Sequence, residues 1–207
     1  LLTGVYEPSE GTVTLDGHLL NGKVPYKIAS LGLGRTFQNI RLFKDLSVLD
    51  NVLIAFGNHH KAHVLASFFR LPAYYKNEEE LKAKALELLK IFDLDKEAET
   101  LAKNLAYGQQ RRLEIVRALA TEPKILFLDE PAAGMNPQET AELTALIRRI
   151  KNEFNITIML IEHDMSLVME VTERIYVLEY GRLIAHGTPD EIKNDKRVIE
   201  AYLGGEA

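Results

Sequence analysis

The sequence has no cysteine among its 207 residues. The chain can therefore form neither a disulfide framework nor a thiolate metal site, and this composition fits a reducing compartment. Positive charge is also scarce, because 25 Lys and Arg residues are outnumbered by 30 Asp and Glu residues. Non-specific nucleic-acid binding needs clustered basic residues, so the net charge of −5 makes nucleic acid a poor candidate partner.

No apolar run reaches the length of a membrane span, and no signal peptide is visible. The composition, 46% hydrophobic and 27% charged, is that of a globular chain long enough to bury a core. We therefore expect one domain over residues 1–207, with room for a subdomain.

The chain starts without an initiator Met, and its first residues read as the end of a helix. Leu1, Leu2 and Thr3 precede Gly4, and a glycine just past the last helical residue is a common cap. A turn-forming stretch follows, and Thr12–Gly17 alternates like a half-buried strand closed by a turn. We therefore expect the chain to open within a domain, truncated at its N-terminal side.

Hydrophobic periodicity predicts an α/β fold. Residues 78–92 have the amphipathic period of a helix, and the sequence after residue 104 alternates apolar strands with helices. Such alternation is typical of a parallel sheet with crossover helices. We expect a helical insert over residues 58–121 inside an α/β body formed by residues 1–57 and 122–207.

Two apolar runs end in residues that can carry chemistry. Ile125–Leu128 is followed by Asp129 and Glu130, and Ile156–Ile161 is followed two positions later by His163. Ligands of open α/β sheets bind at the carboxyl ends of strands, so these side chains should line one rim. Adjacent carboxylates there suit Mg²⁺ and a general base. The alternative, that they only end a strand and cap a helix, is weaker because both runs deliver polar groups to the same rim.

A third candidate site is the segment Leu105–Arg112, which leads into a helix with an apolar face at Leu113, Val116 and Leu119. Free backbone amides and a small glycine at a helix N-terminus can hold an anion. Taken alone, the segment would be better explained as an ordinary helix start with its arginines in solvent.

These segments together resemble the nucleotide-binding subunits of ABC transporters, and the resemblance runs the length of the chain. Five motifs carry it: the Q-loop (Thr36-Phe37-Gln38), the signature motif (Leu105–Gln110), the Walker B strand (Ile125–Asp129), the D-loop (Ala133–Asn136) and the switch histidine (His163). The resemblance implies an ABC-type ATPase with a parallel-sheet RecA-like core, an antiparallel β piece near the N-terminus and a helical subdomain.

The resemblance also implies roles for particular residues. Asp129 and Gln38 would hold Mg²⁺, Glu130 would activate the water that attacks the γ-phosphate of ATP, and His163 would contact that phosphate. The signature motif would bind ATP held by the opposite subunit of a head-to-tail dimer, homo- or heteromeric. The residues expected to contact ATP are Gln38, Ala106, Tyr107, Gly108, Gln109 and Asn136.

Two positions depart from the pattern of the family. The signature motif usually has Ser at its second position, where this chain has Ala106, so phosphate contact there would rest on backbone amides and the helix dipole. The D-loop usually ends in Asp, where this chain has Asn136. Both departures concern side-chain contacts rather than the fold.

The finer resemblance is to the ATPases of branched-chain amino acid importers, through "GRTFQNIRLFKDLSVLDNVLIA", "LAYGQQRRLEIVRALA" and the C-terminal tail. It implies permease partners and a cytoplasmic location on the inner face of the cell membrane. Urea importers and lipopolysaccharide exporters share much of the tail and stay open as alternatives.

A soluble, non-transport ABC ATPase is disfavoured because no heptad repeat separates Gln38 from Leu105. A binding module without hydrolysis is disfavoured by the presence of Glu130 and His163.

In this family the phosphate loop, G-x-x-x-x-G-K-[ST], opens a helix that runs into an "LLTG"-like end. The resemblance therefore implies that the opening residues are the tail of that helix and that the phosphate loop itself is missing. We expect the 207-residue chain alone to bind ATP poorly and to be inactive, and the intact protein to bind ATP well.

Overall fold

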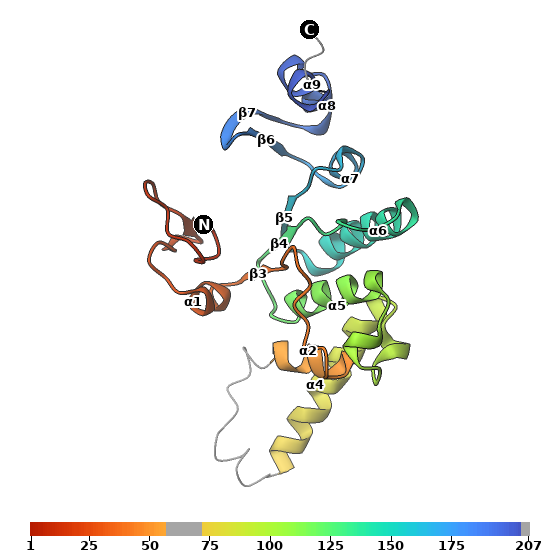
Figure 1. Cartoon of the computed structure of the whole chain (residues 1–207). Helices are drawn as coiled ribbons and strands as arrows, with labels where there is room; N and C mark the ends of the chain where they lie inside the picture. Colours follow the sequence, from red (N-terminus) through yellow and green to blue (C-terminus); the bar gives the residue numbers. More distant parts are fainter. Residues whose placement is uncertain (57–71, 204–207) are drawn as a thin grey trace.

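The computed structural model describes residues 1–56 and 72–203. Its centre is a three-stranded parallel sheet in the order β3 (Leu33–Arg35), β4 (Ile125–Asp129) and β5 (Thr157–Ile161). The register pairs Leu33 with Ile125 and Asp129 with Ile161, so β4 and β5 end at the same edge (Figure 1). The predicted parallel sheet and its α/β class are confirmed.

Gly34 lets β3 lie close to the chain that leads into β4. A Cβ atom at this position would lie 3.0 Å from the Cβ of Pro123. Only glycine avoids that contact without a shift of the neighbouring chain. This close approach packs β3 against the chain that enters β4, and after β3 the amide of Thr36 donates to the carbonyl of Phe127 at 2.9 Å.

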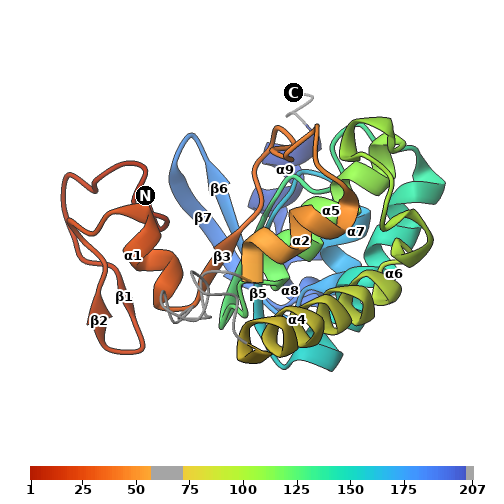
Figure 2. The same cartoon turned by 90° about the horizontal axis from the view of Figure 1, so that it is seen from below.

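Helices form a layer beside the sheet, as Figures 1 and 2 show from two directions. The helices of this layer are α2 (Val48–Phe56), α4 (Pro72–Ile91) and α5 (Tyr107–Leu119), with two short 3-10 turns at Asp95–Glu97 and Ala102–Asn104. The largest buried apolar cluster joins them to β4 and α6 (Pro137–Phe154). The expected insert, residues 58–121, lies partly outside the described residues, and α2, just before it, packs on α4 and α5.

The N-terminal part is a small antiparallel hairpin, β1 (Thr14–Leu15) and β2 (His18–Leu19), followed by α1 (Pro25–Ser30). Of the strand and closing turn expected over Thr12–Gly17, the turn lies at Asp16 and Gly17, which take positive φ values of 48° and 76°, and the strand covers only Thr14 and Leu15. A second buried cluster joins this part to β3 and β4; it contains Leu15, Leu20, Ile28, Leu33 and Phe127.

The C-terminal part begins with α7 (Met165–Val171) and an antiparallel pair, β6 (Ile175–Glu179) and β7 (Arg182–Gly187). Two helices, α8 (Pro189–Lys193) and α9 (Lys196–Leu203), follow. Val168, Ile175, Ile192 and Val198 form the buried cluster that holds this part together. No helix within the described ranges is long and apolar enough to span a membrane.

Candidate functional site

The carboxyl end of β4 brings two acidic residues to one edge of the sheet. Asp129 is the last residue of the strand, and Glu130 follows with a φ of 44°. The Glu130 amide donates to the carbonyl of Ile161 at 2.9 Å, which continues the β4–β5 pairing one step past the strand. A non-glycine residue in this left-handed region costs about 1–3 kcal/mol, so the surrounding contacts must hold it there.

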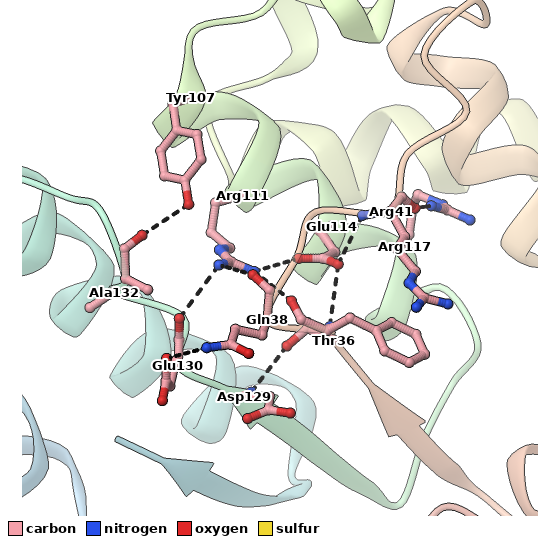
Figure 3. Close-up of polar contacts among 12 residues, drawn as sticks. Thr36, Gln38, Arg41, Tyr107, Arg111, Glu114, Arg117, Asp129, Glu130 and Ala132 are labelled. Carbon is pink, nitrogen blue, oxygen red and sulfur yellow. Dashed lines mark hydrogen bonds and ion pairs between the residues drawn. The ribbon is translucent and has the colours of Figure 1, made fainter. Parts of the chain in front are cut away.

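Gln38 reaches the same edge from the segment that follows β3. Its Nε2 donates to Oε2 of Glu130 at 2.9 Å (Figure 3). This contact joins two residues that are distant in the sequence, because β3 and β4 are neighbours in the sheet. The structure thus brings together Gln38, Asp129 and Glu130.

Asp129 is held by contacts that the sequence did not predict. Its Oδ2 lies 2.8 Å from the guanidinium of Arg35, which also donates to the hydroxyl of Thr3 at 2.8 Å. The Asp129 amide donates to Oγ1 of Thr36 at 3.3 Å, and Thr36 is fully buried. The carboxylate therefore has a partly exposed cationic partner on the neighbouring strand.

His163 follows β5, and its side chain is 75% exposed. Its Nδ1 lies 3.7 Å from Oε2 of Glu162, a buried carboxylate that also accepts from the amide of Ala132 at 2.9 Å. The hydroxyl of Tyr202 donates to the carbonyl of His163 at 2.9 Å. The parallel register puts His163 at the same sheet edge as Glu130, but within the described residues no hydrogen bond joins the imidazole to Gln38 or Glu130.

Asp164, the next residue, caps α7. Its Oδ1 accepts from the amides of Ser166 and Leu167 at 2.9 and 3.4 Å, and it also pairs with the hydroxyl of Ser166. The Ser166 hydroxyl, followed by the two amides, holds the pKa of this carboxyl below its usual value. The chain that carries His163 is thereby anchored on both sides, by Glu162 and by Asp164.

The signature segment forms the first turn of α5. Ala106 precedes the helix, and its amide donates to Oε1 of Gln109 at 3.1 Å. The hydroxyl of Tyr107 donates to the carbonyl of Ala133 at 2.9 Å. A Cβ atom on Gly108 would lie 3.3 Å from Oε1 of Glu139. The structure therefore places this segment against the loop between β4 and α6, and no described side-chain hydrogen bond joins residues 106–109 to Gln38, Asp129 or Glu130.

Asn136 has a structural partner that the sequence analysis missed. Its Oδ1 accepts from the amides of Gln138 and Glu139 at 3.0 Å, and Oε2 of Glu139 accepts from the Asn136 amide at 2.9 Å. This is a reciprocal cap of α6. The N-x-x-E spacing is the sequence signal that could have revealed it. An ATP contact from this side chain would have to use Nδ2, because Oδ1 is engaged.

Two further side chains were missed entirely. Arg111 and Glu114 on α5 are buried, with 0% and 4% of their surface exposed, so the alternative that leaves the arginines of this segment in solvent fails for Arg111. They form an ion pair at 2.8 Å beside the backbone of Gln38 (Figure 3). Helical periodicity gave no signal for them, since an apolar stripe is the only pattern it detects.

A near-match to a phosphate loop occurs at Gly17–Val24, which reads GHLLNGKV. Val24 stands where the motif needs Ser or Thr for Mg²⁺. The segment contains β2 and leads into a helix of only six residues, α1. It lies in the N-terminal hairpin, whose cluster of buried residues is separate from the edge that carries Glu130.

The parallel sheet, the helical layer and the polar edge at β4 define an ATP-binding cassette. The family model described as ABC transporter matches residues 1–133, and the one described as branched-chain amino acid ATP-binding cassette transporter matches residues 182–207. The chain belongs to the ABC transporter family and is an ABC-type ATPase.

Curated and solved relatives agree with this assignment. The high-affinity branched-chain amino acid transport ATP-binding protein BraF of Pseudomonas aeruginosa is 47% identical over 98% of this chain and 80% of that protein. The ADP conformation of MJ1267, an ATP-binding cassette of an ABC transporter, has 31% identity and a TM-score of 0.80 over 99% of this chain and 81% of that one. The dimeric post-hydrolysis structure of the cassette MJ0796 with ADP and Pi has 25% identity and a TM-score of 0.74, covering 90% and 77%.

Proposed function

We propose that this chain powers the import of branched-chain amino acids by hydrolysing ATP at the carboxyl end of β4. The observation that carries the proposal is the hydrogen bond between Gln38 and Glu130 beside Asp129. The names of the relatives and the family matched by residues 182–207 favour branched-chain amino acids as the transported substrate. Urea import and lipopolysaccharide export are the competing assignments.

In this proposal Glu130 is the general base. Its carboxylate takes a proton from the water that attacks the γ-phosphate, a role that contributes about 10²–10⁴-fold to the rate. The Gln38 amide donates one hydrogen bond to Oε2 of Glu130 and so orients the carboxylate. The left-handed backbone of Glu130 fixes the direction in which its side chain leaves the sheet.

The oxygen donors at this edge fit Mg²⁺ together with the phosphates of ATP. Mg²⁺ often binds through one or two carboxylates and substrate phosphates, rather than through an all-protein cage. Accordingly, no group of three or more His, Cys, Asp or Glu residues in residues 1–56 and 72–203 is placed to hold a metal ion. Asp129 and the Oε1 of Gln38 would hold the ion, which when bound neutralises charge on the phosphates. The Arg35 guanidinium, 2.8 Å from Asp129, would have to yield one carboxylate oxygen.

The exposed imidazole of His163 would contact the γ-phosphate, and the first turn of α5 would serve the ATP held by a like subunit. An anion at a helix N-terminus is stabilised by free amides and the helix dipole, so Tyr107, Gly108 and Gln109 can act without a signature serine. The Ala106 amide, which donates to Oε1 of Gln109, would join them only if that hydrogen bond opened. Asn136 would contribute from the adjacent loop. A head-to-tail dimer follows from this arrangement, and the dimeric relative bound to ADP and Pi supports it.

The partners of the dimer would be permease subunits that hold it at the inner face of the cell membrane. We assign residues 58–121 to a helical subdomain and residues 1–57 and 122–207 to the α/β body. Packing of α4 and α5 around a common apolar cluster supports the helical assignment.

The mechanism is tested by ATP turnover of the full-length protein with Glu130→Gln. This change keeps the hydrogen-bonding shape but removes the base, so kcat should fall by about 10²-fold or more while ATP affinity is retained. Glu173→Gln, which removes an exposed carboxylate paired with Lys151, is the control and should turn over normally. Equal turnover in Glu130→Gln and the control would refute the role.

The transported substrate is tested by uptake assays that compare the parent protein with Glu130→Gln. Vesicles that contain the reconstituted transporter should take up leucine when ATP is present, and Glu130→Gln should abolish that uptake. Uptake of urea without leucine, or lipid export alone, would replace the substrate assignment and leave the hydrolysis mechanism intact.

A further inference from the structure

Arg111 and Glu114 form a buried ion pair that holds the segment carrying Gln38. Arg111 Nη1 donates to Oε2 of Glu114 and to the carbonyl of Phe37, both at 2.8 Å. Arg111 Nη2 donates to the carbonyl of Gln38 at 2.9 Å. Oε1 of Glu114 accepts from the amides of Phe37 and Arg41, both at 3.3 Å. Carbonyls and amides of one short segment are thus bound from the side of α5.

The same guanidinium also faces the end of β4. Arg111 Nη2 lies 3.5 Å from the carbonyl oxygen of Glu130, the longest of its contacts (Figure 3). Gln38 and Glu130 share a side-chain hydrogen bond on the other side of their backbones. Arg111 therefore contacts the main chain of both Gln38 and Glu130. It lies on α5, the helix that begins with the signature segment.

Stability does not explain why a charged pair occupies this place. Burying two charges carries a large desolvation cost, and apolar side chains of similar volume often stabilise a fold equally well or better. The cost here is increased because Arg111 Nε is buried without a hydrogen-bond partner among the described residues. What apolar side chains could not supply is the set of directional hydrogen bonds to residues 37, 38 and 41.

We propose that the Arg111–Glu114 pair positions Gln38 and Glu130 for hydrolysis and ties them to the signature helix. The proposal rests on the function proposed above, because the pair would hold the hydrolytic residues in a fixed position relative to α5. Both side chains are positioning residues, since they are buried and act through the main chain of residues 37, 38, 41 and 130. A displacement of α5 would move the Gln38 carbonyl directly and change the geometry of the Gln38–Glu130 pair.

The test replaces the pair by apolar residues of similar volume, Arg111→Met with Glu114→Leu, in the full-length protein. Such a replacement keeps the core filled but leaves the carbonyls of Phe37 and Gln38 and the amides of Phe37 and Arg41 without these partners, so the thermal midpoint should fall. The rate of each variant is therefore measured at a temperature at which circular dichroism shows it to be folded. A misplacement of about 1 Å can cost up to about 100-fold in rate, so kcat for ATP should fall by about 10- to 100-fold with little change in ATP affinity. Arg111→Lys, which keeps the charge but loses the forked geometry, should fold and lose kcat as well.

Arg149 provides a matched control. It stands on α6, pairs with Glu153 at 2.7 Å and donates to the carbonyl of Ile91 at 3.1 Å, so it also joins a guanidinium to a carboxylate and a main-chain carbonyl. Arg149 is 49% exposed, and its contacts are with Glu153 and Ile91 rather than with the segment that carries Gln38, so Arg149→Met should leave kcat unchanged. A loss of kcat equal to that of the Arg111 variants would overturn the proposal.

A double-mutant cycle with Gln38→Ala supplies a readout that a purely structural role would not move. If the pair acts through Gln38, its replacement should lower kcat by less than about threefold in the Gln38→Ala background. An undiminished loss in that background, or parental kcat in the folded apolar variant, contradicts the inference. Failure of the proposed function is distinguishable, because the parent protein itself would then show no turnover that depends on Glu130.

Discussion

Asp164 shows at the scale of one residue how the site is anchored. It follows His163 and caps α7, and replacing an aspartate cap by alanine costs about 0.5–2 kcal/mol. The contacts with Ser166 and Leu167 also lower its pKa in the folded state. A carboxyl group with a lowered folded pKa stabilises the fold above its unfolded pKa, and this contribution is lost as the pH falls through the folded value.

We therefore predict that Asp164→Ala lowers the free energy of unfolding by about 1 kcal/mol at pH 7. Below about pH 4, the difference in free energy of unfolding between this variant and the parent should become smaller. Urea unfolding at several pH values measures this difference. Asp164→Asn is the control, because asparagine caps a helix without titrating, and it should stay close to the parent at pH 7. A penalty for Asp164→Ala that stays constant into acid would contradict the titration argument.

Also at the scale of one residue, the burial of Arg111 could not be predicted from the sequence. The pattern of α5 identified the apolar face that contains Leu113 and Val116, both fully buried. An arginine beside that face is ordinarily solvated, so nothing in the sequence indicated complete burial. Its environment depends on the segment after β3, which folds over α5 from a distant part of the chain. Tertiary contacts of this kind have no local pattern.

At the scale of elements, the sequence predicted the parts that depend on burial alone. The apolar runs at Ile125–Leu128 and Ile156–Ile161 became neighbouring parallel strands. Burial on both faces holds for β4, but Met159 and Ile161 of β5 are 42% and 51% exposed. The positions of Asp129 and Glu130 at the strand end followed from that topology. The cap by Asn136 was overlooked although its spacing was visible.

The packing of α5 is also an element-scale property, and it can be tested by creating a cavity. Leu113 is fully buried in the largest apolar cluster, so Leu113→Ala should lower the free energy of unfolding by about 2–5 kcal/mol. Ile54 on α2 is 48% exposed, and Ile54→Ala should change it by about 0.5 kcal/mol or less. Denaturant unfolding compares the two, and equal losses would contradict the packing described for α5.

At the scale of the whole molecule, the two candidate parts of the site lie on different elements. Gln38, Asp129 and Glu130 gather at the end of β4, while residues 106–109 pack against the loop before α6. In the dimer proposed above, each set would belong to a different site. Each copy would then supply one set to each of two equivalent sites.

The most direct test of this central claim mixes two inactive full-length variants and measures ATP turnover. Glu130→Gln removes the base, and Gly108→Asp puts a negative charge where the phosphate of the other subunit would bind. A mixed dimer then has one site with both parental parts, so an equal mixture should recover about a quarter of the parental rate. Recovery to that level supports a site shared between subunits. A mixture as inactive as either variant alone, with both proteins folded, would contradict it.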